Sequence, residues 1–136
     1  MRILSKISGP TVLRIGLSLV FLWFGTQQFL HTEMWVGFIP EYAIRLSPFS
    51  AETLVNINGT LELIFGAALI LGIFTRVSAF ILFLHMVHIT ATVGYSSIGV
   101  RDFGLTVAAF SIFLIGADAL TLDQRLFNRR EILDKQ

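Results

Sequence analysis

Apolar residues along this chain gather into four long segments separated by shorter polar stretches. The apolar segments run over residues 11–30, 52–74, 77–95 and 101–120. Each is close to the roughly 20 residues that an α-helix needs to cross about 30 Å of hydrocarbon. The runs are continuously apolar and lack the period-two alternation of a membrane β-strand. The pattern therefore predicts an all-α fold, an integral membrane four-helix transmembrane bundle with an up-down-up-down course.

The stretches between these segments predict how the helices are joined. Gly72 and the pair Thr75-Arg76 leave room only for a tight hairpin, so the second and third segments should be antiparallel neighbours. Residues 31–53 form a long aromatic loop, which favours an anchor at the membrane surface over a lid above a site. Residues 121–134 begin with a capping-box pattern and predict a C-terminal interfacial amphipathic helix, with a partner-docking helix as the alternative. Glycines along the segments predict close helix packing.

The composition agrees with a lipid environment. The chain is 54% hydrophobic and only 14% charged, whereas a soluble domain carries about a quarter charged residues. Its length predicts one domain, residues 1–136. The net charge of +1 gives no reason to expect a nucleic-acid partner. The absence of cysteine excludes disulfides, thiolate nucleophiles and iron–sulfur ligation, so a redox role would need a bound cofactor or a partner subunit.

Lysine and arginine positions predict the orientation in the membrane. Eight of the ten basic residues fall on the side of the two termini, and only Arg45 and Arg101 fall on the other side. The eight are Arg2, Lys6, Arg14, Arg76, Arg125, Arg129, Arg130 and Lys135. The positive-inside rule then predicts a multi-pass protein of the cell (plasma or inner) membrane with both termini in the cytoplasm.

Several polar side chains interrupt the apolar segments, and each is costly at membrane depth unless it is paired. At 1.5 Å per residue, Glu62 should lie about 12 Å below the outer surface and His88 about 17 Å above the inner one, at nearly the same depth. All four segments contribute polar groups to the outer half of the bundle. The predicted ligand-binding residues are Gln28, Asn58, Glu62, His85, His88, Arg101 and Asp102.

Three interpretations of this polar cluster compete. In the first, Glu62 pairs with His88 or Arg101, Asn58 and Gln28 complete the hydrogen bonds, and the cluster only holds the helices together. In the second, the cluster faces a cavity and binds a polar head such as a quinone carbonyl, with imidazole and carboxylate able to exchange protons. In the third, His85, His88 and Glu62 hold a metal ion or haem. The sequence supports this least, because the remaining histidine, His31, lies at the surface.

Short motifs occur along nearly the whole chain. The stretch from Asn58-Gly59 through Glu62, Gly66 and Gly72 to Thr75-Arg76 has the pattern G-x-x-E…G…G…T-R. Two later stretches are Val-Arg-Asp-Phe-Gly-Leu at 100–105 and Gly116 followed by Leu122-Asp123. In their order and spacing these motifs resemble the DoxX family of small four-helix membrane proteins.

One position departs from the family pattern. The family commonly ends its first helix with G-x-x-K, whereas here Gly25 is followed at that spacing by Gln28. A lysine partner for Glu62 is therefore missing, and Arg101 becomes the expected counter-ion.

The family includes the DoxD-type subunit of thiosulfate:quinone oxidoreductase and proteins linked to membrane redox stress complexes. The resemblance implies a DoxX-like membrane subunit that binds a quinone or another lipid-soluble ligand near Glu62, His88 and Arg101 in a redox-linked complex. The alternative is a non-catalytic scaffold or assembly partner whose cluster only specifies helix packing. A small proton-coupled carrier, which would need to oligomerise, is the third class. The expected partners are the lipid bilayer and either partner subunits or further copies of the chain.

Overall fold

Four long helices and a short helical connection make up the computed structural model, which describes residues 7–126. The long helices are α1 (Gly9–Leu30), α4 (Ala51–Leu71), α5 (Thr75–Val93) and α6 (Ser97–Ile115). The connection from α1 to α4 contains α2 (Thr32–Trp35), η2 (Val36–Phe38) and α3 (Glu41–Leu46). Each long helix is long and apolar enough to cross a membrane. The predicted all-α four-helix bundle is confirmed.

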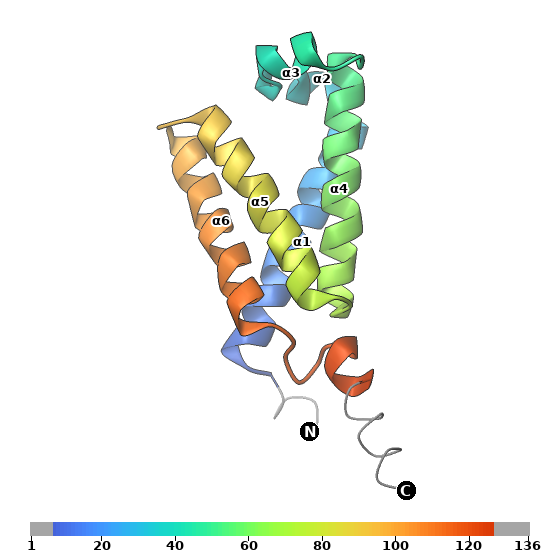
Figure 1. The fold of residues 1–136 in the computed structure, drawn as a ribbon, viewed down its shortest axis with the longest axis vertical. Helices are drawn as coiled ribbons and strands as arrows, with labels where there is room; N and C mark the ends of the chain where they lie inside the picture. Colours follow the sequence, from blue (N-terminus) through green and yellow to red (C-terminus); the bar gives the residue numbers. More distant parts are fainter. Residues whose placement is uncertain (1–6, 127–136) are drawn as a thin grey trace, which may run out of the picture.

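The long helices pack as two close pairs, α1 with α4 and α5 with α6. Helices α4 and α5 also touch, as expected for the neighbours of a tight hairpin. Figure 1 shows the two pairs meeting near the α4–α5 turn and diverging towards the end that carries α3. We call these the terminal end (residues 7–8, 72–74 and 116–126) and the α3 end (residues 31–50 and 94–96).

Glycine brings the backbones of α1 and α4 together. A Cβ atom placed on Gly25 would lie 2.8 Å from the carbonyl oxygen of Gly59, and one on Gly59 would lie 3.1 Å from that of Gly25. A larger residue at either position would force the helices apart, so the predicted role of small residues in helix packing holds here.

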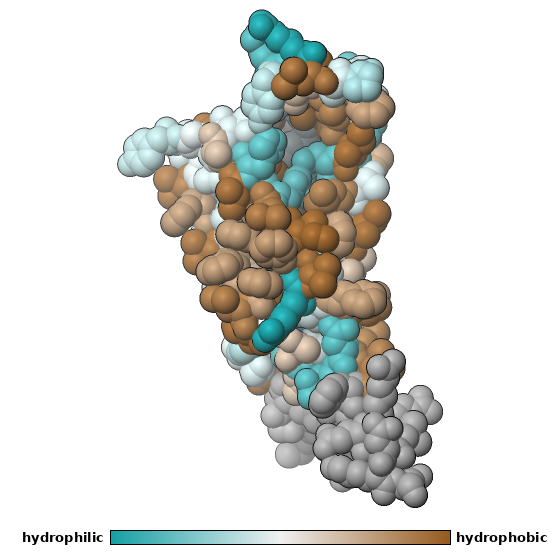
Figure 2. All heavy atoms as spheres, in the orientation of Figure 1, coloured by the Kyte–Doolittle hydropathy of each residue, from teal (hydrophilic) through white to brown (hydrophobic). Residues whose placement is uncertain are grey.

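The side chains between the helices form a narrow apolar core, and the outer faces are equally apolar. Leu17, Phe21, Leu69, Leu82 and Ile112 are buried in the core. Many other large apolar side chains are exposed, and Figure 2 shows hydrophobic residues covering the sides of the helices. A surface of this kind is suited to lipid and would aggregate in water.

The fourth helix ends earlier than the sequence pattern predicts. The predicted span is 101–120, but α6 ends at Ile115 because Gly116 takes a positive φ of 79° and breaks the helix. The apolar residues that follow continue the hydropathy signal without continuing the helix. Asp118 therefore lies in a loop rather than at the end of a helix.

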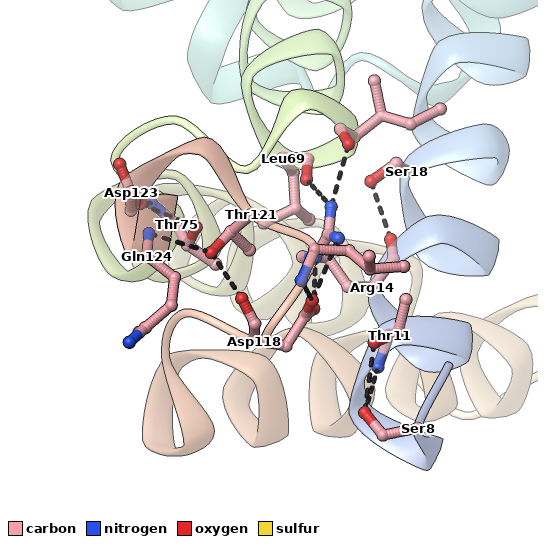
Figure 3. A network of polar contacts seen from close by, with 12 residues as sticks. Ser8, Thr11, Arg14, Ser18, Leu69, Thr75, Asp118, Thr121, Asp123 and Gln124 are labelled. Atoms are coloured by element: carbon pink, nitrogen blue, oxygen red, sulfur yellow. Dashed lines mark hydrogen bonds and ion pairs between the residues drawn. The ribbon is translucent and has the colours of Figure 1, made fainter. Parts of the chain in front are cut away.

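That loop places Asp118 against a buried arginine (Figure 3). Arg14 of α1 donates from Nε to Asp118 Oδ2 at 2.7 Å, and the two side chains are only 2% and 5% exposed. The guanidinium also donates to the carbonyl oxygens of Leu69 and Ile70 at 2.7 and 2.8 Å. These carbonyls belong to the last turn of α4, whose negative dipole end favours a cation. Arg14 thus joins α1 to the last turn of α4 and to the loop after α6.

A second acidic residue of the same segment caps α5. Asp123 accepts hydrogen bonds from the backbone N–H groups of Phe74 and Thr75 at 2.9 and 2.7 Å, and from the Thr75 hydroxyl at 2.8 Å. Phe74 has a positive φ of 48°, which is uncommon for a residue with a side chain. The carboxylate therefore stabilises both the start of α5 and a strained turn.

The beginning of the predicted C-terminal helix is visible. Residues 122–126 are helical, and the Thr121 hydroxyl accepts a hydrogen bond from the Gln124 backbone N–H at 3.3 Å, as in a capping box. The rest of the predicted amphipathic helix 121–134 lies outside the described residues.

Candidate functional site

A cavity of about 180 Å³ lies between the two helix pairs at the α3 end. All four long helices line it, and the α2–η2–α3 connection contributes Trp35, Phe38, Ile39 and Pro40. In Figure 2, hydrophilic residues are seen in the hollow between the pairs, beneath the connection. The cavity occupies the half of the bundle in which the sequence predicts the polar cluster.

Glu62 is the centre of a hydrogen-bond network on the cavity wall. Its Oε2 accepts from Gln28 Nε2 of α1 at 2.8 Å, and its Oε1 lies 3.1 Å from His85 Nε2 of α5. Asn58, one turn away on α4, donates to Gln28 Oε1 at 2.8 Å and more weakly to Glu62 Oε1 at 3.4 Å. The Glu62 residue is only 3% exposed. The network therefore ties three helices together at membrane depth.

The predicted hydrogen bonds of Gln28 and Asn58 to Glu62 are confirmed. The predicted pairing is wrong, because Glu62 pairs with His85 rather than with His88 or Arg101. The error comes from counting depth from opposite membrane surfaces. Counted from the shared hairpin, Glu62 lies nine residues before the last residue of α4, and His85 lies ten residues after the first residue of α5. Those two residues are level, and His88 lies nearly one turn farther on.

Arg101 has a counter-ion of its own. Its guanidinium lies 2.7 Å from the Asp102 carboxylate, and its side chain is 50% exposed while that of Asp102 is 3% exposed. The guanidinium carbon also lies 5.0 Å from the centre of the Phe24 ring, a cation–π arrangement with α1. The expectation that Arg101 neutralises Glu62 is therefore corrected.

His88 reaches the connection above the cavity. Its Nε2 is hydrogen-bonded to the hydroxyl of Tyr42 on α3, and the two rings meet edge to face. In the sequence, Tyr42 is only one aromatic residue of the loop 31–53. One sequence feature could have predicted this bond. Tyr42 carries a hydroxyl group and lies on the same predicted side of the membrane as the half of the bundle that contains His88.

The structure brings six of the seven predicted site residues to one cavity: Gln28, Asn58, Glu62, His88, Arg101 and Asp102. The seventh, His85, stands behind Glu62 and is 9% exposed at its side chain. Apolar lining residues such as Val55, Met86 and Leu105 were missed, because an apolar residue facing a cavity has the same sequence pattern as one facing the core or lipid.

Both carboxylates on the cavity wall have close partners. Glu62 faces His85, and Asp102 faces Arg101. Over residues 7–126, every buried side-chain nitrogen and oxygen atom has a hydrogen-bond partner. Within the same range, no group of three or more His, Cys, Asp or Glu side chains is placed to hold a metal ion. The polar wall can therefore offer hydrogen bonds, and its buried polar atoms are already partnered.

These features define a multi-pass membrane protein, a bundle of four apolar helices with a polar-walled cavity at one end. Comparison with family models places the chain more narrowly, because residues 9–95 match the DoxX model. The chain belongs to the DoxX family. The comparisons with curated proteins and with solved structures found no match. The matched range contains Gln28, Asn58, Glu62, His85 and His88, whereas α6 with Arg101 and Asp102 lies beyond it.

Proposed function

We propose that this DoxX-family protein binds the uncharged polar head of a lipid-soluble molecule of the quinone type in the cavity at the α3 end. The observation that carries the proposal is the composition of the cavity wall. Polar side chains from all four long helices meet there among apolar and aromatic residues. A mostly apolar pocket with a few convergent polar groups is the usual form of a small-molecule site.

The size of the cavity supports a single-ring head group. Its volume is about 180 Å³, and a protein cavity of ~150 Å³ holds one benzene molecule. Arg101, His88 and Gln28 line the cavity and carry N–H groups that suit carbonyl oxygens. The residues present therefore fit a quinone head, whose chemistry is reversible uptake of electrons and protons.

The balance of charge favours an uncharged head group. Glu62 and Asp102 both line the cavity. Asp102 is paired with Arg101, and Glu62 is hydrogen-bonded to Gln28 and His85. A carboxylate or phosphate head would lie near these acids without a free cation to offset the repulsion. A neutral carbonyl or hydroxyl head meets no such repulsion.

A redox-linked membrane complex is the setting we propose for this binding. The chain contains no cysteine, so electrons would have to come from the bound molecule or from a partner subunit. On this proposal, the protein is a membrane subunit that presents or stabilises the ligand for such a partner.

Ligand binding can be measured with the chain's own tryptophans. Trp35 lines the cavity, whereas Trp23 is 57% exposed on the outer face. In the Trp23→Phe variant, Trp35 is the remaining tryptophan, and a decyl-substituted benzoquinone bound in the cavity should quench its fluorescence in nanodiscs. Loss of one N–H donor to the head in His88→Ala should weaken binding about twofold to tenfold. The exposed Glu33→Gln is the control; equal quenching in all variants would contradict the proposal.

A scaffold role is the second candidate, and a specific observation favours it. In the described part of the chain, the polar network closes on itself without an unsatisfied buried atom. A scaffold predicts no saturable quenching of Trp35 by the probe and a loss of thermal stability in Glu62→Gln. Saturable quenching that depends on His88 would favour the ligand site.

A further inference from the structure

The connection above the cavity is anchored at only one of its ends. Helix α2 packs against α1 and α4, and Thr32 donates from its hydroxyl to the Gln28 carbonyl oxygen at 2.8 Å. Helix α3 is different, because none of its six residues is buried. Figure 1 shows α3 lying beyond the gap between the diverging helix pairs.

A single side-chain hydrogen bond joins α3 to the long helices within residues 7–126, and it is the bond between Tyr42 and His88. The other side-chain bond of α3, from Arg45 to Glu41, stays within the helix and is exposed. His88 lines the cavity, whereas Tyr42 does not. The bond therefore joins α3 to a residue of the cavity wall, although Tyr42 itself is not part of that wall.

Extended residues flank α3 on both sides. Ile39 and Pro40 precede it with ψ angles of 122° and 144°, and Ser47 follows it with a ψ of 152°. A short rigid helix between two extended links can swing as a unit when its one lateral bond breaks.

We propose that α3 is a lid over the cavity and that the Tyr42–His88 hydrogen bond is its latch. This inference rests on the proposed ligand site, whose access it controls. The lid opens to admit the head of the ligand, and the latch forms again over the bound molecule. Weakening the latch should then speed entry and exit together and leave the equilibrium affinity unchanged.

The kinetic test uses Tyr42→Phe, which removes the hydroxyl and keeps the ring. We expect stopped-flow quenching of Trp35 by the decyl-substituted benzoquinone, in the Trp23→Phe background, to show both rate constants raised roughly twofold to tenfold. The dissociation constant should stay within about a factor of two, because both rates change together. The matched control is Tyr95→Phe, since Tyr95 is fully exposed in the turn between α5 and α6. An unchanged association rate constant, with or without a change in affinity, would overturn the latch.

Lid position can also be measured without any ligand. Because the chain has no cysteine, spin labels can be attached at Arg45→Cys on α3 and Val100→Cys on α6. Both native residues are exposed. Pulsed electron paramagnetic resonance should give one main distance with Tyr42 present and an added, longer population in Tyr42→Phe. If the lid opens in Tyr42→Phe but the probe does not bind, the proposed function is wrong and the lid proposal stands. If the probe binds but the label distance is the same in Tyr42→Phe, only the lid proposal is wrong.

Discussion

The carboxylate of Glu62 accepts hydrogen bonds from the side chains of Gln28 and Asn58 and pairs with His85. A carboxylate at membrane depth costs several kcal/mol when it is alone, and pairing offsets this cost. The three partners depend on Glu62 in turn, because each would otherwise face an apolar environment with a polar atom unmatched. Glu62 therefore stabilises the bundle and shapes the cavity wall at the same time.

Removing this carboxylate should lower the free energy of unfolding by more than the loss of a single hydrogen bond would. We expect Glu62→Leu to lower the free energy of unfolding by about 2–5 kcal/mol, because it leaves donors on α1, α4 and α5 unsatisfied. Glu62→Gln keeps an acceptor oxygen and should cost about 1–2 kcal/mol. Chemical denaturation in detergent micelles measures both values. The exposed Glu41→Leu is the control, and a cost for Glu62→Leu no larger than that of the control would contradict the network.

The Arg14–Asp118 pair at the other end should behave as a coupled unit. Arg14→Ala leaves a buried aspartate without its cation and should cost about 3–5 kcal/mol. The double variant Arg14→Ala with Asp118→Ala removes both charges, so its cost should be smaller than the sum of the single costs. Unfolding in micelles of all four members of the cycle tests this. Simple additivity would contradict a direct interaction.

At the scale of elements, residues 116–126 hold the α4–α5 hairpin through two aspartates. Burial by itself raises the pKa of Asp118, but hydrogen bonds from Arg14 and the Leu120 N–H, with the charge of Arg14, outweigh it and hold the pKa below the ordinary aspartate value. Burial likewise raises the pKa of Asp123, and the Thr75 and Phe74 donors outweigh it, so that this pKa is also lowered. Both groups therefore link the stability of the hairpin to pH.

A group whose pKa is lowered by folding stabilises the protein above its unfolded pKa and loses that contribution as the pH falls through its folded pKa. The unfolded value for aspartate is about 4, so the melting temperature should fall on acidification below about pH 4. Asp123→Asn should reduce the slope of this fall and destabilise the protein at pH 7 by about 1–3 kcal/mol. Thermal melts between pH 3 and 7 measure both effects, with Glu33→Gln as an exposed control. A pH slope unaffected by Asp123→Asn would disprove the assignment.

The four helices could be predicted from the sequence alone, but the end of α6 and the contact between distant residues could not. Hydropathy locates the four helices, because lipid requires long apolar runs, and the hairpin correctly makes the second and third segments neighbours. It misplaces the end of α6, since Gly116 stops a helix without interrupting the apolar pattern. It also misses the link from Arg14 to Asp118, because 104 positions separate these two residues along the chain.

At the scale of the whole molecule, the cavity follows from the divergence of two helix pairs. Polar residues in apolar segments could be predicted to gather in one half of the bundle, since each needs a partner. Their pairing could not, because it depends on helix tilt and on the registry between α4 and α5. The role of Tyr42 depends on how residues 31–50 fold over the cavity, and a loop without periodicity carries no such signal.

The basic residues predict the side of the membrane on which this cavity opens. Within the described residues, Arg14, Arg76 and Arg125 lie towards the terminal end, and Arg45 and Arg101 lie towards the α3 end. In the sequence, eight of the ten basic residues lie near the two chain termini or in the hairpin after the second apolar segment, so the terminal end should face the cytoplasm.

The absence of cysteine allows this orientation to be read with single labels. A membrane-impermeant maleimide added to intact cells should modify Tyr95→Cys in the α5–α6 turn and should leave Leu126→Cys unmodified until the membrane is permeabilised. Both native side chains are exposed, so protection of either one would come from the membrane and not from the fold. The opposite pattern would place the α3 lid in the cytoplasm. With the expected pattern, the lid and the polar cavity face the outer leaflet, from which a lipid-soluble ligand enters when the lid opens.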